Sequence, residues 1–397
     1  MYKPVKVTER IHWIGENDRK TELFENMWPI PFGVSYNSYL IVDEKVALVD
    51  TLEYGSSDDY INKIEQLLNG RNIDYLIINH MEPDHSGAIK LIVGKYPNIK
   101  LVGNLKTFKI IESYFGYQEK WHQVEDGDGL DLGYHTLKFI MTPWVHWPET
   151  MMTYDLTEKV LFSGDAFGSF GTLDGGIFDD EIEFEEYYET EMRRYYSNIV
   201  GKYSNMVQKA FKKLEGIDIK YICATHGPVW RKDVNKVISL YNKWSNFEAE
   251  DGVVIIYGSM YGNTAKIADC IARKLSEEGI KKIRVYDASK THLSYLINEI
   301  WKYKGVILGS CAYNSGMLPT MENLTRNLEH IGLKNRFLGL FGSYSWNGGG
   351  VKALFKFHEN MEWELVSDPV DTKGIPGDES FERCEAVAVA MANKLKL

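Results

Sequence analysis

The sequence predicts two α/β domains in series, a layered domain with much antiparallel pairing followed by a doubly wound parallel sheet. At about 100–200 residues per domain, 397 residues correspond to two or three domains. Strand and helix patterns alternate regularly only after about residue 250, and a polar, charged stretch at 242–252 precedes that point. Seven of the ten histidines also lie before it. We therefore expect the domains to span 1–250 and 251–397.

Apolar runs bounded by turn residues predict the strands of the first domain. These runs lie at 37–42, 45–50, 75–79, 99–103, 136–141, 151–154, 160–162 and 221–224. Asp43 and Glu44 separate the first two runs and predict a hairpin. Helices are expected at 57–68 and over a long region at 184–214. Strands and helices mix without strict alternation, which favours a layered α/β or α+β fold.

The second domain alternates strand and helix throughout. Strands are expected at 253–257, 282–286, 305–309, 336–341 and near 364–366. Apolar residues recur with the helical period over 264–278, and a last helix is expected at 380–396. Five strands joined by crossover helices are typical of a doubly wound, five-stranded parallel sheet.

Composition excludes several classes of function. The chain has 45 Lys and Arg against 56 Asp and Glu, a net charge of −11. This balance argues against nucleic-acid binding and against docking on an anionic membrane, which both need a basic face. No apolar run approaches the roughly 18 residues of a membrane span, and no signal core follows the N-terminus, so we expect a cytosolic protein. The four cysteines form no CxxC pair, which argues against a disulfide framework or a Cys₄ metal centre.

Side chains able to bind metals follow several predicted strands. The strand at 75–79 runs into the hexapeptide HMEPDH, whose Pro83 stiffens the turn. Three more candidates each follow a later hydrophobic strand, so all of them can converge on one edge of a sheet. The predicted metal-ligating and catalytic residues are His80, Glu82, Asp84, His85, His146, Asp165 and His226.

This pattern resembles the metallo-β-lactamase fold, an αββα sandwich whose usual motif reads HxHxDH. Here Glu82 replaces the second histidine, and mixed carboxylate and imidazole ligands suit iron better than an all-imidazole set does. Two Fe²⁺ ions carry four positive charges against three carboxylates, so one bridging hydroxide would neutralise the site. The expected non-protein bridge is an oxo or hydroxo group. Asp165 is the expected bridge because it lies midway in the ligand order.

A polar glycine-containing loop follows the first strand of the second domain. The segment GSMYGNT at 258–264 offers hydroxyls and backbone N–H groups at a helix N-terminus, which is an anion site. It lacks the lysine of a nucleotide-binding P-loop. It resembles the flavodoxin phosphate loop, which binds FMN, with Tyr261 in place of the middle hydroxyl residue.

Two further loops, at 310–316 and 343–350, follow later strands and should lie at the same sheet edge. We expect Cys311 to be structural because no histidine is adjacent. The predicted FMN-binding residues are Ser259, Met260, Tyr261, Gly262, Asn263, Thr264, Ser310, Cys311, Ala312, Tyr313, Asn314, Gly316, Ser343, Tyr344, Ser345, Trp346, Asn347, Gly348 and Gly349.

Together the two halves resemble the flavodiiron proteins over essentially the whole chain. The resemblance implies one iron held by residues matching His80, Glu82, His146 and Asp165. It implies a second iron held by residues matching Asp84, His85, Asp165 and His226. Members reduce O₂ to water, NO to N₂O, or both, and protect cells from these gases. A diferrous centre and reduced FMN together hold the four electrons that O₂ needs.

The resemblance also implies partners. Flavodiiron proteins are head-to-tail homodimers, some paired into dimers of dimers, in which the FMN of one subunit faces the irons of the other. Trp147 is expected either near that interface or in the core. Without a CxxC module in this sequence, electrons should come from a separate donor, rubredoxin or reduced deazaflavin F420. Preference between the gases would lie in groups around the ligands, with 22–36 as the candidate segment.

Two other functions remain open at this point. One is a zinc-dependent hydrolase of the metallo-β-lactamase fold, against which Glu82 argues. The other is a flavodoxin-like electron carrier with a vestigial metal site.

Overall fold

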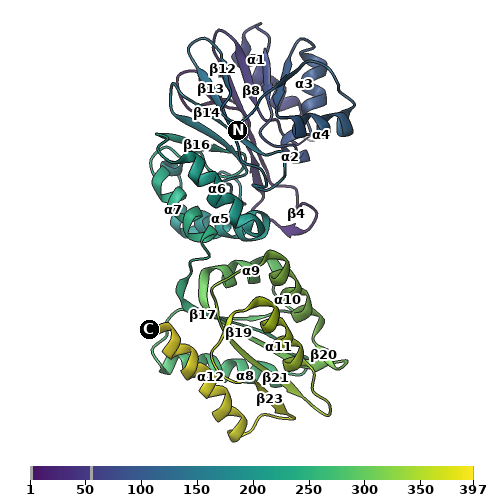
Figure 1. The fold of residues 1–397 in the computed structure, drawn as a ribbon, viewed down its shortest axis with the longest axis vertical. Helices are drawn as coiled ribbons and strands as arrows, with labels where there is room; N and C mark the ends of the chain where they lie inside the picture. The colour runs from purple at the N-terminus through teal and green to yellow at the C-terminus, as the bar shows by residue number, and fades with distance from the viewer. Residues whose placement is uncertain (1–2, 54–56, 397) are drawn as a thin grey trace. The chain divides into compact units, whose positions relative to one another are not determined.

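The computed structural model describes residues 3–53 and 57–396, and the chain divides into two compact units, Met1–Ser245 and Asn246–Leu397 (Figure 1). Each unit has its own sheets and its own hydrophobic core. Among the helices within 3–53 and 57–396, none has both the length and the apolar character needed to cross a membrane.

The first unit contains a mixed sheet of seven strands. In spatial order they are β1 (Val5–Lys6), β2 (Ile11–Trp13), β7 (Tyr39–Val42), β8 (Val46–Val49), β9 (Tyr75–Ile77), β10 (Lys100–Gly103) and β11 (Trp121–Gln123). Pairing is antiparallel from β1 to β8 and parallel from β8 to β11. The predicted hairpin at 43–44 is confirmed, because Val42 pairs with Val46 across it.

A second sheet of five strands packs against the first. Its strands are β12 (Gly129–Asp131), β13 (Thr136–Met141), β14 (Met151–Asp155), β15 (Val160–Gly164) and β16 (Tyr221–Ala224). Only β15 and β16 are parallel. Two short ribbons precede it along the chain: β3 (Glu16–Asp18) with β6 (Val34–Tyr36), and β4 (Leu23–Phe24) with β5 (Trp28–Pro29).

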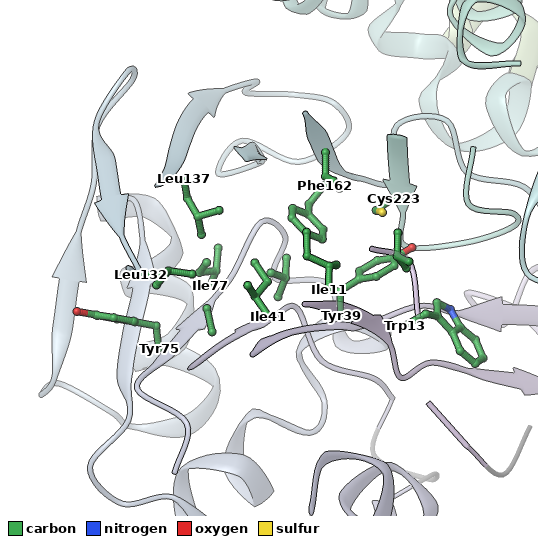
Figure 2. Packing of buried hydrophobic residues seen from close by; sticks show 14 of the residues in the cluster. Ile11, Trp13, Tyr39, Ile41, Tyr75, Ile77, Leu132, Leu137, Phe162 and Cys223 are labelled. Atoms are coloured by element: carbon green, nitrogen blue, oxygen red, sulfur yellow. The ribbon is translucent and has the colours of Figure 1, made fainter. Parts of the chain in front are cut away.

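The core of this unit lies between the two sheets. Ile41 and Ile77 point inward from one sheet, and Leu137 and Phe162 meet them from the other (Figure 2). Helices cover the outer faces: α1 (Ser57–Leu68), α2 (Pro83–Ser86), α3 (Ile89–Lys95) and α4 (Leu105–Phe115) on one side, and α5 (Glu189–Tyr195), α6 (Ser204–Leu214) and α7 (Val234–Ser245) on the other (Figure 1). The predicted αββα sandwich is confirmed.

The long helical region expected at 184–214 is not one continuous helix. Wider π-helical turns at Phe184–Tyr188 and Tyr196–Val200 and a tighter 3₁₀ turn at Gly201–Tyr203 interrupt it. A π turn adds one residue to a turn and so rotates the side chains that follow it. At the start of the second π turn the consecutive residues Arg194, Tyr195 and Tyr196 are all fully buried.

The second unit is a doubly wound sheet, as predicted. Its main path runs β18 (Ile283–Asp287), β17 (Glu250–Gly258), β19 (Tyr303–Tyr313), β21 (Phe337–Tyr344) and β22 (Glu364–Leu365), all parallel. The fifth position is interrupted, since β23 (Val370–Lys373) continues beside β21 after β22 ends. A short antiparallel strand, β20 (Gly316–Met317), folds back on β19.

Five helices flank this sheet: α8 (Asn263–Glu277), α9 (Leu293–Lys302), α10 (Pro319–Ile331), α11 (Gly350–Met361) and α12 (Asp378–Lys396). Helices α8 and α12 pack on each other, and their buried residues join the cluster formed by β17, β19 and β21. Buried Arg336 donates from its guanidinium to carbonyls of Ile300 and Trp301 at the end of α9 and of Phe247 before β17. These bonds fix the N-terminal end of the sheet.

Replacing Ile41 by Ala should destabilise the first unit by about 2–5 kcal/mol, because the fully buried side chain leaves a cavity between the sheets. Leu156→Ala is the control: Leu156 lies in a turn with 42% of its surface exposed and should change stability little. Urea unfolding followed by far-UV circular dichroism measures both. Equal midpoints for the two variants would contradict the assigned core.

Candidate metal centre and flavin site

The seven predicted ligands meet at one end of the sandwich in the first unit. His80 follows β9, and the short helix α2 carries Asp84 and His85 directly after it. His146 lies in the β13–β14 connection, Asp165 follows β15 and His226 follows β16. Strand ends of both sheets therefore bring all seven together, as the sequence predicts.

One group contains His80, Glu82, His146 and Asp165. The Nε2 atom of His146 is 3.0 Å from Glu82 Oε2 and 3.0 Å from Asp165 Oδ2. The Nε2 atom of His80 is 3.1 Å from that Glu82 oxygen and 3.3 Å from Asp165 Oδ2. Ligand atoms about 2.1 Å from a shared ion and at right angles lie about 3 Å apart, so these spacings suit one metal.

The second group contains Asp84, His85 and His226. The Nε2 atoms of both histidines lie 3.2 Å from Asp84 Oδ2. Asp165 joins this group through its other oxygen, since Oδ1 is 2.9 Å from His85 Nε2. The two oxygens of the Asp165 carboxylate therefore face different groups.

Buried polar atoms without hydrogen-bond partners show that these residues fit metal ions. Both carboxylate oxygens of Asp84 and the Nε2 atoms of His85 and His226 are buried and make no hydrogen bond. An unsatisfied buried polar atom is costly, and a coordinated cation would satisfy each of them. The donor set of imidazoles and carboxylates is that of non-haem iron sites.

Other side chains orient the candidate ligands. His80 Nδ1 is 2.8 Å from Glu149 Oε1, which also accepts from the Met81 backbone N–H. His226 Nδ1 donates to the Ser35 carbonyl at 2.8 Å. In both rings the proton on Nδ1 leaves Nε2 free to bind a metal. Glu149 was not among the predicted residues, and its only signal in the sequence is its place three residues after His146.

The pKa shifts of the candidate ligands also indicate that a bound cation would suit the cluster. Burial acts to raise the pKa of Glu82, but hydrogen bonds from His146 and His80 outweigh it and hold the pKa well below its usual range. Burial raises the pKa of Asp84 to about 7, which shows that the imidazoles compensate its charge incompletely. Burial acts to lower the pKa of His146, yet the bonds to Asp165 and Glu82 raise it to about 9. The raised pKa values of Asp84 and His146 indicate an excess of negative charge in the cluster.

Aromatic side chains surround His226. Phe24 and Tyr36, both within the segment 22–36, lie edge-on to its ring at centroid distances of 5.4 and 5.6 Å. Tyr195 lies 5.5 Å from it, and its buried hydroxyl makes no hydrogen bond. Sequence reasoning missed Tyr195, because its inward orientation depends on the irregular helical turns. These buried rings give the second group an aromatic surrounding on the side of His226.

Trp147 lies close to the first group. Its ring is edge-on to His80 at 5.2 Å and lies 6.4 Å from His146. The side chain is only partly buried. Its expected place at a subunit interface remains a prediction.

The three predicted flavin loops line one cavity of about 270 Å³ in the second unit. The loops follow β17, β19 and β21, which are adjacent in the sheet. The lining residues are Ser259, Met260, Tyr261, Asn263, Thr264, Cys311, Ala312, Asn314, Ser315, Ser343, Tyr344, Ser345, Trp346 and Asn347.

Six of the predicted residues do not line this cavity, although all lie in the same loops: Gly262, Ser310, Tyr313, Gly316, Gly348 and Gly349. Gly262 instead precedes α8 with a φ of +93°, a conformation that favours glycine. The Ser310 hydroxyl accepts from the Leu318 backbone N–H and so supports the neighbouring loop. Ser315, which lines the cavity, was not among the predicted contacts.

The cavity suits a flat ring with a phosphate tail. The N-terminus of α8 and the hydroxyl of Thr264, 2.8 Å from the Ser343 hydroxyl, form the polar end. The rings of Tyr261 and Trp346 are 92% and 88% exposed, which leaves their faces available for stacking. Burial raises the pKa of the Cys311 thiol, which makes it a poor nucleophile.

Comparisons with known proteins match both units. A family model described as "ODP family beta lactamase" matches residues 34–227, and a flavodoxin model matches 255–373. The anaerobic nitric oxide reductase flavorubredoxin of Pectobacterium carotovorum is 34% identical over 96% of this chain and 76% of its own.

Solved structures extend the likeness to the whole fold. The rubredoxin oxygen:oxidoreductase of Desulfovibrio gigas superposes with a TM-score of 0.94 at 30% identity, covering 99% of this chain and 98% of that one. The flavodiiron protein of Giardia intestinalis gives a TM-score of 0.93 at 25% identity, covering 99% and 97%. The chain therefore belongs to the flavodiiron protein family, and its cofactors are FMN and a pair of non-haem irons.

Proposed function

We propose that this protein reduces O₂ to water, NO to N₂O, or both, at its diiron site, with FMN supplying electrons from an external donor. The observation that carries the proposal is the position of Asp165, whose Oδ1 and Oδ2 face the two ligand groups separately. A carboxylate so placed can bind both irons. The names of the relatives, a nitric oxide reductase and an oxygen oxidoreductase, support the two gases as substrates.

In this proposal one iron is held by His80, Glu82, His146 and Asp165, and the other by Asp84, His85, Asp165 and His226. When bound, the irons supply open coordination positions and electrons for the gas. The chain itself keeps the site rigid: Glu149 and the Ser35 carbonyl fix two imidazole rings, and the Thr225 hydroxyl donates to Asp165 Oδ1 at 2.6 Å. Rings of Phe24, Tyr36 and Tyr195 limit the access of water.

We further propose a head-to-tail homodimer and a separate electron donor, rubredoxin or reduced F420. The partly exposed Trp147 beside His80 supports a route by which electrons reach the irons from a neighbouring subunit's flavin. Detoxification of the two gases is the expected physiological role.

Glu82→Ala should abolish reduction of both gases and leave FMN binding intact, because Glu82 contributes only to the metal centre of the first unit. Anaerobic consumption of O₂ and of NO, with chemically reduced rubredoxin as donor, measures the loss. Glu125→Ala, at an exposed carboxylate, is the control. Comparable wild-type turnover with both gases would establish dual function.

Unchanged gas reduction in Glu82→Ala would instead mean that the metal site is vestigial. Two bound zinc ions together with hydrolase turnover would replace the proposal with a hydrolytic function.

Glu149→Gln should weaken iron binding by about 10- to 100-fold, as loss of an orienting carboxylate behind a histidine ligand generally does. The amide keeps the shape of the side chain but removes the charge that holds the His80 Nδ1 proton. Iron release to a chelator, followed by absorbance, measures the effect. A release rate equal to that of the wild type would show that Glu149 has only a packing role.

Thr264→Val should weaken FMN binding by about 10- to 100-fold, because the isosteric change removes a hydroxyl at the expected phosphate end, and a hydrogen bond to a charged group is worth about 1.5–3 kcal/mol. Ser276→Ala, near the other end of the same helix, is the matched control. Fluorescence titration of the apoflavoprotein gives both affinities. Equal affinities would place the phosphate elsewhere.

A further inference from the structure

We propose that the first unit carries a separate binding site for a zinc-like divalent cation at the end of its second sheet opposite the diiron centre. Its ligands are His135 Nε2 and the Glu158 carboxylate. His135 directly precedes β13 and Glu158 lies just before β15, whereas His146 and Asp165 follow the same two strands. The two sites therefore occupy opposite ends of β13 and β15.

The orientation of His135 is fixed in the same way as that of His80. Its Nδ1 is 3.1 Å from Asp155 Oδ2, and an ionised carboxylate can only accept a hydrogen bond. Asp155 is itself held by the backbone N–H groups of Thr157 and Glu158, at 3.1 and 2.8 Å. In the neutral ring the proton is therefore on Nδ1 and a lone pair is on Nε2. This carboxylate–histidine pair is the arrangement that orients metal-binding imidazoles.

The Nε2 atom of His135 has no hydrogen-bond partner, although the residue is 0% exposed. It faces Glu158 Oε2 at 3.9 Å, which is too long for a hydrogen bond. Two ligand atoms that each lie about 2.0–2.2 Å from one ion are up to about 4.2 Å apart, so a cation fits between them. The Glu158 side chain is 18% exposed, which lets water reach the ion and complete its coordination.

The surrounding charge suits a divalent ion. Besides Asp155 and Glu158, a third carboxylate belongs to Asp43, whose Oδ2 accepts a hydrogen bond from the His135 backbone N–H at 2.6 Å. Arg10 pairs with the other Asp43 oxygen at 2.6 Å and lies over the Tyr134 ring. These four charged side chains sum to −2. An imidazole nitrogen among the ligands favours Zn²⁺ over Mg²⁺ or Ca²⁺.

Such an ion would connect two turns of the second sheet, the one before β13 and the one between β14 and β15. The Thr8 hydroxyl, from the turn between β1 and β2, contacts Glu158 and links this turn of the first sheet to the site. The ion would thus stabilise the end of the sandwich opposite the diiron centre, and gas reduction would not depend on it.

The test uses the full chain loaded with two irons and FMN, equilibrated with Zn²⁺ and then desalted. We expect one zinc per chain in addition to two irons, with a nitrogen and oxygen shell in zinc X-ray absorption. Glu158→Gln should lower zinc affinity by at least about tenfold and leave gas reduction unchanged. Glu9→Gln, at an exposed nearby carboxylate, should bind zinc like the wild type.

Glu158→Gln is the deciding variant because its side chain reaches solvent, whereas His135 is fully buried. Absence of a third ion would overturn the proposal. Zinc that displaces iron, or zinc retained equally by Glu158→Gln, would overturn it as well.

Discussion

The ionised carboxylate of Asp165 is only 1% exposed and lies among several imidazoles. The free-energy cost of burying this charge constrains the rest of the first unit. Removing a charge from water costs several kcal/mol unless close partners compensate it. The imidazoles of His80, His85 and His146 approach its oxygens within 3.3 Å, but Asp84 and Glu82 add further negative charge nearby. Bound metal cations would balance this negative charge.

A second set of groups keeps the imidazoles from turning. Glu149 lies behind His80 and the Ser35 carbonyl behind His226, so each ring presents Nε2 to the centre. The same relation recurs between Asp155 and His135 at the other end of the second sheet. In all three cases an acceptor fixes Nδ1 of a buried histidine and turns Nε2 toward a carboxylate, which is the arrangement of metal-binding imidazoles.

The fold could be predicted closely where periodic apolar runs exist. The predicted bounds of the helix at 57–68 and the strands at 136–141 and 221–224 match those of α1, β13 and β16. The short strands β3 to β6, of two or three residues each, carry no readable period and were not predicted. The irregular turns within 184–214 escaped prediction for a different reason, since tertiary burial of consecutive residues there overrides the helical pattern.

The same contrast applies to the sites. All seven candidate ligands could be found because each follows a strand and is a residue type that binds metals. Glu149, Tyr195 and Ser315 could not, because their roles depend on how a loop or an irregular helix turns in space. Asp155 and His135 were also missed, since a single histidine in a sequence is far more often an ordinary surface or core residue.

In both units the candidate site lies where several strands end. In the second unit β17, β19 and β21 are parallel neighbours, so the three loops that follow them open on one side of the sheet. In the first unit β9, β15 and β16 end at the site, although they belong to two different sheets. Packing the sheets face to face brings those ends together, which lets a mixed sandwich gather seven candidate ligands. The core between the sheets, with Ile41 and Phe162, therefore supports the metal site as well as the fold.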